Sequence, residues 1–414
     1  MTSDDNRYDF AMQLQNKVQT RNLDIENTLI LNPVENMPPA DILEPCRSNF
    51  HGLYNTDTQR DKEGKFNSKL QFSGRNLITD DISTVYEQWA ELLGASELSM
   101  RLLSGLHAHT VVFMALSNIG DKVMLLPEKA GGHVSGKAIL QRLGLQVFDI
   151  PIDEKNMRVD KQQCLKDISD INPDFIFIDR SEGLIYEDFS WVKEIDNCCK
   201  IFDASQYLTN IICNDYKNPF DMGFDMILST MHKNLPGPQR ALICSKEDTS
   251  QWSRLRKGIS TYVSNMHFFT IYSAGLLLGH MDELRQLSSS MLKNAAVLDN
   301  ELENNNIPII HRIPLDNEPI THHCWIQPLT REKAFDLFLV LERLGILTNY
   351  RLLPYNIGYG LRLGLSGATV SGLNETTIPE LARIIAEAYT NGYSTMLHKN
   401  SIDLIQEIKK AKLL

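Results

Sequence analysis

The chain has 414 residues, of which 43% are hydrophobic and 22% are charged, and its formal net charge is −11 at pH 7. This composition is that of a globular protein and excludes a disordered, fibrous or membrane-embedded chain, while the length favours two domains. The acidic balance, without a stripe of Lys and Arg, argues against a nucleic-acid partner.

Residues 1–35 are predicted to form an N-terminal arm. Residues 1–30 are polar with a helical pattern, and the prolines that follow at Pro33, Pro38 and Pro39 end any helix. The first residues lack the basic region and apolar core of a signal peptide, and no apolar run is long enough to cross a membrane. We therefore expect a cytoplasmic protein without a membrane partner.

Residues 36–280 are predicted to form a large α/β domain. A polar stretch over residues 51–80 is either a surface excursion or a mobile loop, and its composition does not indicate its role. Beyond it, helical segments alternate with short apolar strands, a pattern that predicts a mostly parallel, doubly wound sheet whose ligands collect at the carboxyl ends of the strands. The expected strands include 122–126, 146–150, 175–178, 200–202 and 226–228.

Residues 281–414 are predicted to form a small α+β domain. A long helical stretch over 282–304 leads into it, and further helices are expected over 331–344 and 375–391. Strand patterns lie at 322–326 and 360–364. The seven cysteines of the whole chain contain no C-x-x-C pair and no metal-ligand spacing with histidine, so reduced thiols and no metal are expected.

Lys233 is the first candidate for catalysis. It follows the strand at 226–228 and precedes a Pro-Gly-Pro turn at 236–238, which would fix the backbone after it. A lysine that is held by packing and kept from full solvation can form an imine with pyridoxal phosphate. Asp203 ends the strand at 200–202, where its carboxylate could keep the pyridine nitrogen of that cofactor protonated.

Three further motifs suit the same cofactor and its substrate. Ser104-Gly105-Leu106-His107 precedes a helical run and could present N–H groups to a phosphate. Gly131-Gly132-His133 allows a close approach of the backbone and offers a ring for stacking. Arg362 supplies a guanidinium fork for a carboxylate. Each motif alone is also typical of a structural residue or an ordinary helix cap, and their order along the chain is what points to one cofactor.

That order resembles the serine hydroxymethyltransferase family over about residues 25 to 375. Residues 230–241 are similar to the family's Thr-Thr-His-Lys-Thr-Leu-x-Gly-Pro-Arg-Gly-Gly, and residues 103–109 are similar to its His-Ser-Gly-Ser-Gln-Ala-Asn. Residues 131–133 match its Gly-Gly-His and residues 360–364 match its Gly-x-Arg-x-Gly. Residues 34–36 are similar to its Ser-Glu-Asn. The resemblance implies a fold-type I pyridoxal 5′-phosphate enzyme with a seven-stranded sheet, which acts as a homodimer.

The same resemblance implies roles for individual residues. Lys233 would hold the cofactor as an imine, Asp203 would face its pyridine nitrogen, and His133 would stack on its ring. Arg362 would bind the carboxylate of the substrate. The other residues that the resemblance places around the cofactor or the substrate are Ser104, Gly105, Leu106, Gln206, Thr230, His232 and Glu35.

The chain departs from the family where the family carries a catalytic glutamate. The motif Tyr-x-Glu-Gly-Tyr falls on Phe50-His51-Gly52-Leu53-Tyr54, which contains no carboxylate, and this argues against folate-dependent chemistry. His51 and Tyr54 are candidates for a replacement acid–base group, or are packing residues. Leu106 replaces a serine of the family and Gln206 a histidine. Pro236-Gly237-Pro238-Gln239 resembles the corresponding run of L-threonine transaldolases, relatives that use no folate.

We expect an enzyme that acts on an α-amino acid, by aldol-type, transaldolase or hydroxymethyl transfer on glycine, serine or threonine, with an aldehyde as a candidate co-substrate. Decarboxylation, elimination and transamination remain open because they share the first step, although a carboxylate held by Arg362 disfavours decarboxylation. A non-catalytic binding relative is the alternative from another class, and the retention of Lys233, Asp203 and Arg362 together argues against it.

Overall fold

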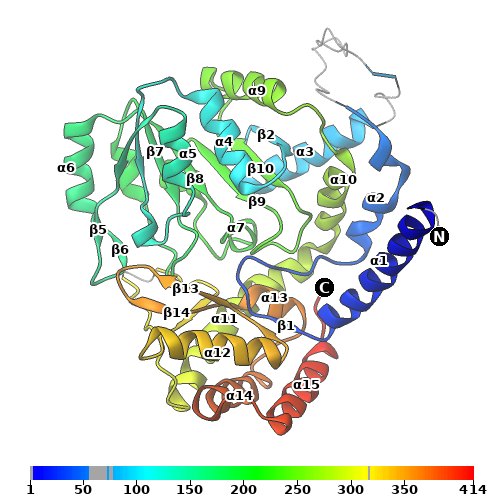
Figure 1. The fold of residues 1–414 in the computed structure, drawn as a ribbon. Coiled ribbons are helices and arrows are strands. Elements are labelled where there is room, and N and C mark those ends of the chain that lie inside the picture. The colour runs from blue at the N-terminus through cyan, green and yellow to red at the C-terminus, as the bar shows by residue number, and fades with distance from the viewer. Residues whose placement is uncertain (1–2, 56–71, 74–77, 316–317) are drawn as a thin grey trace.

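A mixed β-sheet forms the larger, upper part of the molecule in Figure 1. The computed structural model describes residues 3–55, 72–73, 78–315 and 318–414. Within these residues the sheet has seven strands; all run parallel except β10, which is antiparallel to both of its neighbours. In spatial order they are β2 (Glu97–Leu102), β10 (Ala241–Ser245), β9 (Met226–Thr230), β8 (Cys199–Asp203), β7 (Phe175–Asp179), β3 (Lys122–Leu125) and β4 (Gln146–Asp149).

Helices cover both faces of this sheet. Side chains alternate along each strand, so Val123 and Leu125 join the core on one face and Met124 joins the core on the other. Burial of one such side chain stabilises the fold by about 1.5–3 kcal/mol. The first face is covered by α4 (Gly105–Leu116), α5 (Gly136–Arg142) and α9 (Ser250–Tyr262).

The second face belongs to a core that continues into the lower part of the molecule. Trp89 and Leu277 pack in it with strand residues, and so does Ile384 from the C-terminal helices. The helices with side chains in this core include α3 (Thr79–Leu93), α6 (Lys161–Ile171), α7 (Leu208–Ile212), α8 (Pro219–Met222), α10 (Phe268–Leu277) and α11 (Met281–Asn304). Helix α11 packs against α7 of the large domain as well as against C-terminal helices. The domain boundary expected at residue 281 stays a prediction.

A smaller antiparallel sheet forms the lower part (Figure 1). Its three strands within the described residues are β11 (His323–Ile326), β14 (Gly358–Gly364) and β13 (Asn349–Leu353), with β14 in the centre. The accompanying helices are α12 (Arg331–Arg343), α13 (Leu365–Val370), α14 (Ile378–Asn391) and α15 (Thr395–Lys409). The remaining short elements are α2 (Glu44–Arg47), β5 (Ile152–Asp153), β6 (Arg158–Val159), and the 3₁₀ turns η1 (Asp41–Leu43), η2 (Asn49–Gly52), η4 (Glu128–Ala130), η5 (Ser190–Glu194) and η6 (Leu278–His280).

The N-terminal segment links to the C-terminal part of the chain. The predicted helix is present as α1 (Ser3–Glu26), and β1 (Leu29–Ile30) then pairs in parallel with β12 (Ile346–Leu347). Pro33 follows and packs closely against Gly364. A Cβ on Gly364 would lie 2.4 Å from the ring of Pro33. The N-terminal segment therefore passes directly beside the end of β14, the strand that carries Arg362.

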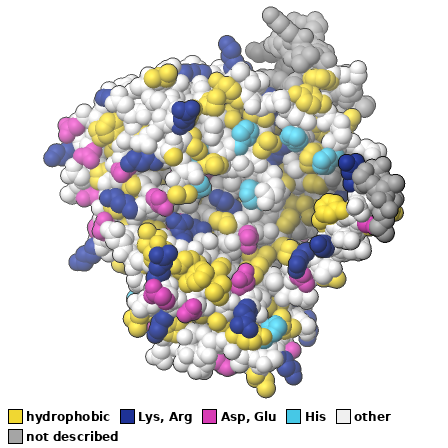
Figure 2. Space-filling view, viewed as in Figure 1, with side chains coloured by type: hydrophobic (Ala, Val, Ile, Leu, Met, Phe, Trp, Pro, Cys, Tyr) yellow, Lys and Arg dark blue, Asp and Glu magenta, His cyan; other side chains and the backbone are white. Residues whose placement is uncertain are grey.

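The α/β fold with a seven-stranded, mostly parallel sheet is confirmed. The antiparallel strand β10 and its neighbour β2 were not among the strands expected from the sequence. On the face seen in Figure 2, Lys and Arg side chains are interspersed with Asp and Glu. No helix in the described ranges is long and apolar enough to cross a membrane.

Candidate active site

Two buried carboxylates lie side by side at the carboxyl edge of the large sheet. Asp179 ends β7 and Asp203 ends β8, and the two residues are directly paired in the register of these parallel strands. Both are almost fully buried, at 2% and 4% exposure. Parallel strands deliver their last side chains to the same edge, which is where α/β sheets bind ligands. The sequence analysis identified Asp203 and missed Asp179, although Asp179 follows directly on an expected strand.

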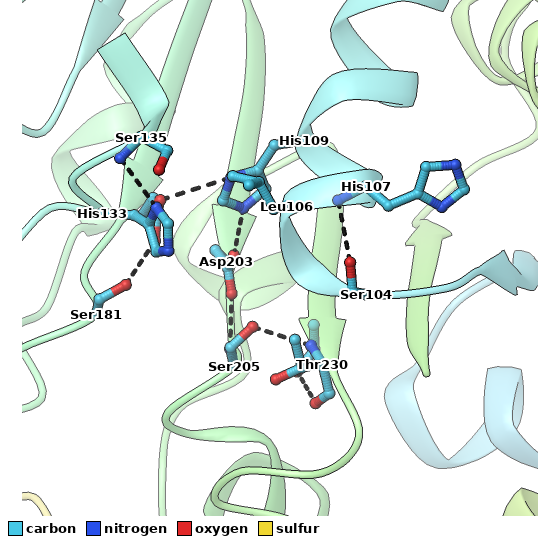
Figure 3. A network of polar contacts seen from close by, with 12 residues as sticks. Ser104, Leu106, His107, His109, His133, Ser135, Ser181, Asp203, Ser205 and Thr230 are labelled. Carbon is cyan, nitrogen blue, oxygen red and sulfur yellow. Dashed lines mark hydrogen bonds and ion pairs between the residues drawn. The ribbon is translucent and has the colours of Figure 1, made fainter. Parts of the chain in front are cut away.

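His109 in α4 lies close to both carboxylates, and Figure 3 shows it beside Asp203. Its Nε2 is 2.7 Å from Oδ2 of Asp203, and its Nδ1 is 3.8 Å from Oδ2 of Asp179. The imidazole packs edge-on against the ring of Phe177, with the ring centres 5.0 Å apart. The backbone N–H of Ser205 donates to the other oxygen of Asp203, Oδ1, at 2.8 Å. Two donors thus hold the Asp203 carboxylate in one orientation.

The cluster favours an ionised Asp203. Burial opposes its charged form, but the hydrogen bond and charge of His109, with a contribution from Lys233, lower the pKa of Asp203. Burial also opposes the charged form of His109, and the negative charges of Asp179 and Asp203 outweigh it and raise the pKa of His109. Burial raises the pKa of Asp179. The arrangement is a carboxylate–imidazolium pair with a second carboxyl group beside it.

Lys233 lies three residues beyond the end of β9, in a loop whose backbone is held from three sides. Its carbonyl oxygen accepts a hydrogen bond from Nδ2 of Asn36 at 2.8 Å. Ser366 of α13 donates to the carbonyl oxygen of Asn234, also at 2.8 Å. The Oδ1 of the buried Asn234 accepts from the backbone N–H of Thr209 at 2.7 Å. These contacts fix the backbone of Lys233 by segments that are far apart in the sequence.

The start of α4 lies against the end of β9. Ser104 caps the helix, with its Oγ accepting from the backbone N–H of His107 at 3.3 Å. A Cβ on Gly105 would lie 2.9 Å from Cγ2 of Thr230, so only glycine allows this approach. The Oγ1 of Thr230 is buried and has no hydrogen-bond partner among the described residues. The side chain of Leu106 is 40% exposed and makes no polar contact, so any contribution of Leu106 to a phosphate site comes from its backbone.

Gly131 and Gly132 allow the loop before His133 to pack tightly. Gly131 has a φ of +85°, and a Cβ there would lie 2.0 Å from the carbonyl oxygen of Glu182. The Nδ1 of His133 accepts from the backbone N–H of Ser135 at 3.2 Å, so a neutral ring carries its proton on Nε2. Burial lowers the pKa of His133 and favours this neutral form.

Arg362 reaches from β14 to the loop after β7. Its Nη1 donates to the carbonyl oxygen of Ser181 at 3.2 Å and lies 3.5 Å from Oε1 of Glu182. Glu182 also forms an ion pair with Arg351 and is 1% exposed. Burial lowers the pKa of Arg362 to about 10, so the guanidinium stays charged at neutral pH, and its Nε has no partner within the described part of the chain. Sequence reasoning missed Glu182, which has no motif of its own.

Gln206 and His232 line the same edge. The Oε1 of buried Gln206 lies 3.3 Å from Nε2 of His323, a distance that suits a hydrogen bond. His322, the residue before His323, is fully buried, and burial lowers its pKa to about 3. Burial and the charge of Lys233 lower the pKa of His232.

His51, Tyr54 and Glu35 have other surroundings in the structure. His51 stacks on the ring of Phe269 in α10 at 4.4 Å, and Tyr54 lies 5.1 Å from Phe72. The side chain of Glu35 is exposed. Within the described residues, none of the three hydrogen bonds to Asp203, Lys233 or Arg362. Their assignment to the substrate stays a prediction.

Comparison with known proteins shows the family. The family model described as serine hydroxymethyltransferase matches residues 71–385. The chain is 24% identical to the serine hydroxymethyltransferase of Pyrobaculum calidifontis (82% of this chain, 81% of the relative) and 26% identical to that of Archaeoglobus fulgidus (84% and 80%). The crystal structure of L-threonine transaldolase from Pseudomonas fluorescens in its internal aldimine state has a similar fold, with a TM-score of 0.89 at 19% identity, covering 100% of this chain and 94% of that one.

The residues of the carboxyl edge fit pyridoxal 5′-phosphate, the cofactor that these comparisons indicate. The unpaired hydroxyl of Thr230 lies beside the start of α4, where free N–H groups attract a phosphate. An ionised Asp203 suits a protonated pyridine nitrogen. The chain belongs to the serine hydroxymethyltransferase family and is a pyridoxal-phosphate-dependent transferase that acts on amino acids.

Proposed function

We propose that the enzyme transfers a group at Cα of glycine, serine or threonine without folate, with an aldehyde as the co-substrate. The carrying observation is that Lys233, Asp203 and Arg362 are all present while the segment Phe50–Tyr54 contains no carboxylate. The similar fold of an L-threonine transaldolase, at 19% identity, supports the fold on which this proposal rests.

Arg362 is proposed to bind the carboxylate of the amino acid. Its guanidinium is buried and charged, and its Nε is free of partners among the described residues. A fork of this kind can bind a carboxylate with two hydrogen bonds, which fixes the orientation of Cα as well as its position. A carboxylate held in this way is kept from leaving, so cleavage of another bond at Cα is favoured.

Lys233 and Asp203 are proposed to act on opposite ends of the cofactor. When bound, the cofactor stores the electron pair released when a bond to Cα breaks. Nζ of Lys233 would hold the cofactor and, once freed from it, could move a proton at Cα of the substrate. The Asp203 carboxylate balances the charge of a protonated ring nitrogen. The neutral ring of His133 offers an apolar face for stacking and an Nε2–H for donation.

The phosphate site is proposed to lie at the start of α4. Ser104 and Gly105 contribute the first turn of the helix, and Thr230 contributes the free hydroxyl beside it. The same neighbourhood contains His232 and Gln206, which we propose to border the cofactor.

The test incubates purified enzyme with L-threonine, L-serine or glycine and an aldehyde, with and without tetrahydrofolate. We expect new β-hydroxy amino acids from L-threonine and the aldehyde in the absence of folate. Strict dependence on folate would overturn the proposal. Lys233→Ala should lose the absorbance band of the bound cofactor, whereas Lys137→Ala, whose exposed ammonium pairs with Asp149, should keep it.

We also propose that the enzyme is a homodimer. Helix α1 exposes large apolar side chains, which a second copy of the chain could cover. Those that are more than 40% exposed are Tyr8, Phe10, Met12, Leu14, Val18, Leu23 and Ile25. Light scattering of the full chain should give twice the monomer mass, and a chain without residues 1–26 should shift toward the monomer. A monomeric full chain would contradict this assignment.

A further inference from the structure

We propose that His109 and Asp179 are positioning residues that keep the Asp203 carboxylate charged and aimed at the ring nitrogen of the cofactor. The inference rests on the proposed role of Asp203 and extends it to two residues that have no such role in the motifs of the family. Their side chains form one buried cluster with that of Asp203, and Figure 3 shows His109 and Asp203 from close by.

The geometry assigns different tasks to the two residues. His109 lies within hydrogen-bonding distance of Asp203, at 2.7 Å, so its Nε2–H can fix Oδ2 in place. Asp179 is 3.8 Å from the other ring nitrogen, which is too far for a hydrogen bond but close enough for a strong charge interaction in a buried site. Asp179 therefore controls the charge of His109, and His109 controls both the charge and the orientation of Asp203.

The cluster is held rigidly from outside. Ser181 donates to Oδ1 of Asp179 at 3.3 Å, and Ser205 holds the second oxygen of Asp203. The hydroxyl of Ser205 in turn accepts from the backbone N–H of Thr230 at 2.9 Å. The cluster is thus linked by hydrogen bonds to Thr230, at the end of β9, which we assign to the phosphate site. A substitution at His109 therefore changes the contacts of Asp203 while these surrounding hydrogen bonds remain.

The sequence departs from the family at this point. The phosphate-turn motif His-Ser-Gly-Ser-Gln-Ala-Asn aligns with residues 103–109, so its asparagine falls on His109. An amide can donate a hydrogen bond but carries no charge, whereas an imidazole can do both. The replacement adds a titratable group beside the pyridine partner, and the ionised forms of Asp179 and Asp203 both favour its protonated state.

A packing role for His109 is the competing explanation, because its ring also contacts Phe177 and His133 edge-on. His109→Gln separates the two explanations, since glutamine keeps a donor and most of the volume but not the charge. Asp179→Asn leaves His109 in place and removes only the charge beside it. Asp149→Asn is the matched control, because Asp149 also ends a parallel strand of the sheet but is exposed.

The first measurement follows cofactor absorbance against pH in the holoenzyme. A carboxylate with a lowered pKa is lost as the pH falls through its folded value, so removal of its cationic neighbour moves this loss to higher pH. We expect the acid limb to move up by about 1–3 pH units in His109→Gln. It should not move in Asp149→Asn. An unchanged limb in His109→Gln, with the cofactor bound, would overturn the inference and leave the proposed function intact.

The second measurement is independent of turnover. Holoenzyme labelled with ¹⁵N-histidine should show one imidazolium signal that persists to higher pH than an ordinary histidine allows. That signal should be absent in His109→Gln and should titrate at lower pH in Asp179→Asn. A neutral His109 in the wild type would overturn the inference. A wild-type protein that binds no cofactor would instead refute the proposed function, and the histidine spectrum would still report the charge of His109.

Discussion

Gly131→Ala should be among the most damaging small substitutions in the molecule. A Cβ on Gly131 would lie 2.0 Å from the carbonyl oxygen of Glu182, whereas real Cβ contacts are essentially never under 3.0 Å, so the backbone must shift by the difference, about 1 Å. The left-handed φ of +85° costs about 1–2 kcal/mol for alanine, and forcing extra volume into packed structure adds about 1–3 kcal/mol. The expected loss of stability is therefore about 2–5 kcal/mol.

Gly120→Ala isolates the backbone contribution to that cost. Gly120 has a similar φ of +92°, but a Cβ on this residue would meet nothing within 4 Å, so its substitution should cost only about 1–2 kcal/mol. Urea denaturation can be followed by tryptophan fluorescence, because Trp89, Trp252 and Trp325 are all buried. Gly131→Ala should also raise KM for the amino acid, since Glu182 forms an ion pair with Arg362. Equal stability of the two variants would refute the argument from close packing.

Three further predictions follow from burial and charge. Arg362→Lys should raise KM for the amino acid about ten- to hundredfold while the cofactor spectrum is unchanged, because one point charge replaces a bidentate fork; an unchanged KM in steady-state assays would remove Arg362 from substrate binding. Phe177→Ala should lower the free energy of unfolding by about 3–5 kcal/mol, whereas Phe335→Ala, at a site that is 44% exposed, should cost clearly less; equal losses in urea titrations would contradict the assigned core. Burial lowers the pKa of His322 to about 3 in the folded protein, whereas the unfolded chain titrates near 6.5. Between these values only the unfolded chain binds the extra proton, so the free energy of unfolding falls as the pH falls. His322→Asn should flatten this slope in unfolding measurements, and an unaltered slope would show that His322 is not buried in its neutral form.

The sheet could be read from the sequence because its strands are short apolar runs separated by helical segments. The strands expected at 122–126, 175–178 and 226–228 appear as β3, β7 and β9 with shifts of a few residues at their ends. The strand β10 was not among the expected strands. Its antiparallel direction was not predictable either, because direction is set by the path of the chain and not by composition.

Candidate site residues could be named from the sequence where a side chain lies in a distinctive local motif. Lys233, Asp203 and Arg362 fall into this class. His109 and Glu182 do not, because their importance arises from partners that the fold brings together: His109 meets Asp203 across 94 positions of the chain. Asp179 was within reach of sequence reasoning, since a carboxylate that follows an expected strand beside the strand of Asp203 should share its edge.

The lysine that carries the cofactor can be identified by chemical trapping. The holoenzyme would be treated with borohydride, which fixes a lysine-bound cofactor irreversibly, then digested and analysed by mass spectrometry. We predict that the peptide containing Lys233 carries the added mass of the reduced cofactor, and that Lys233→Ala yields no labelled peptide. Labelling of a different lysine in the wild type, or of none while the cofactor is bound, would contradict the assignment of Lys233.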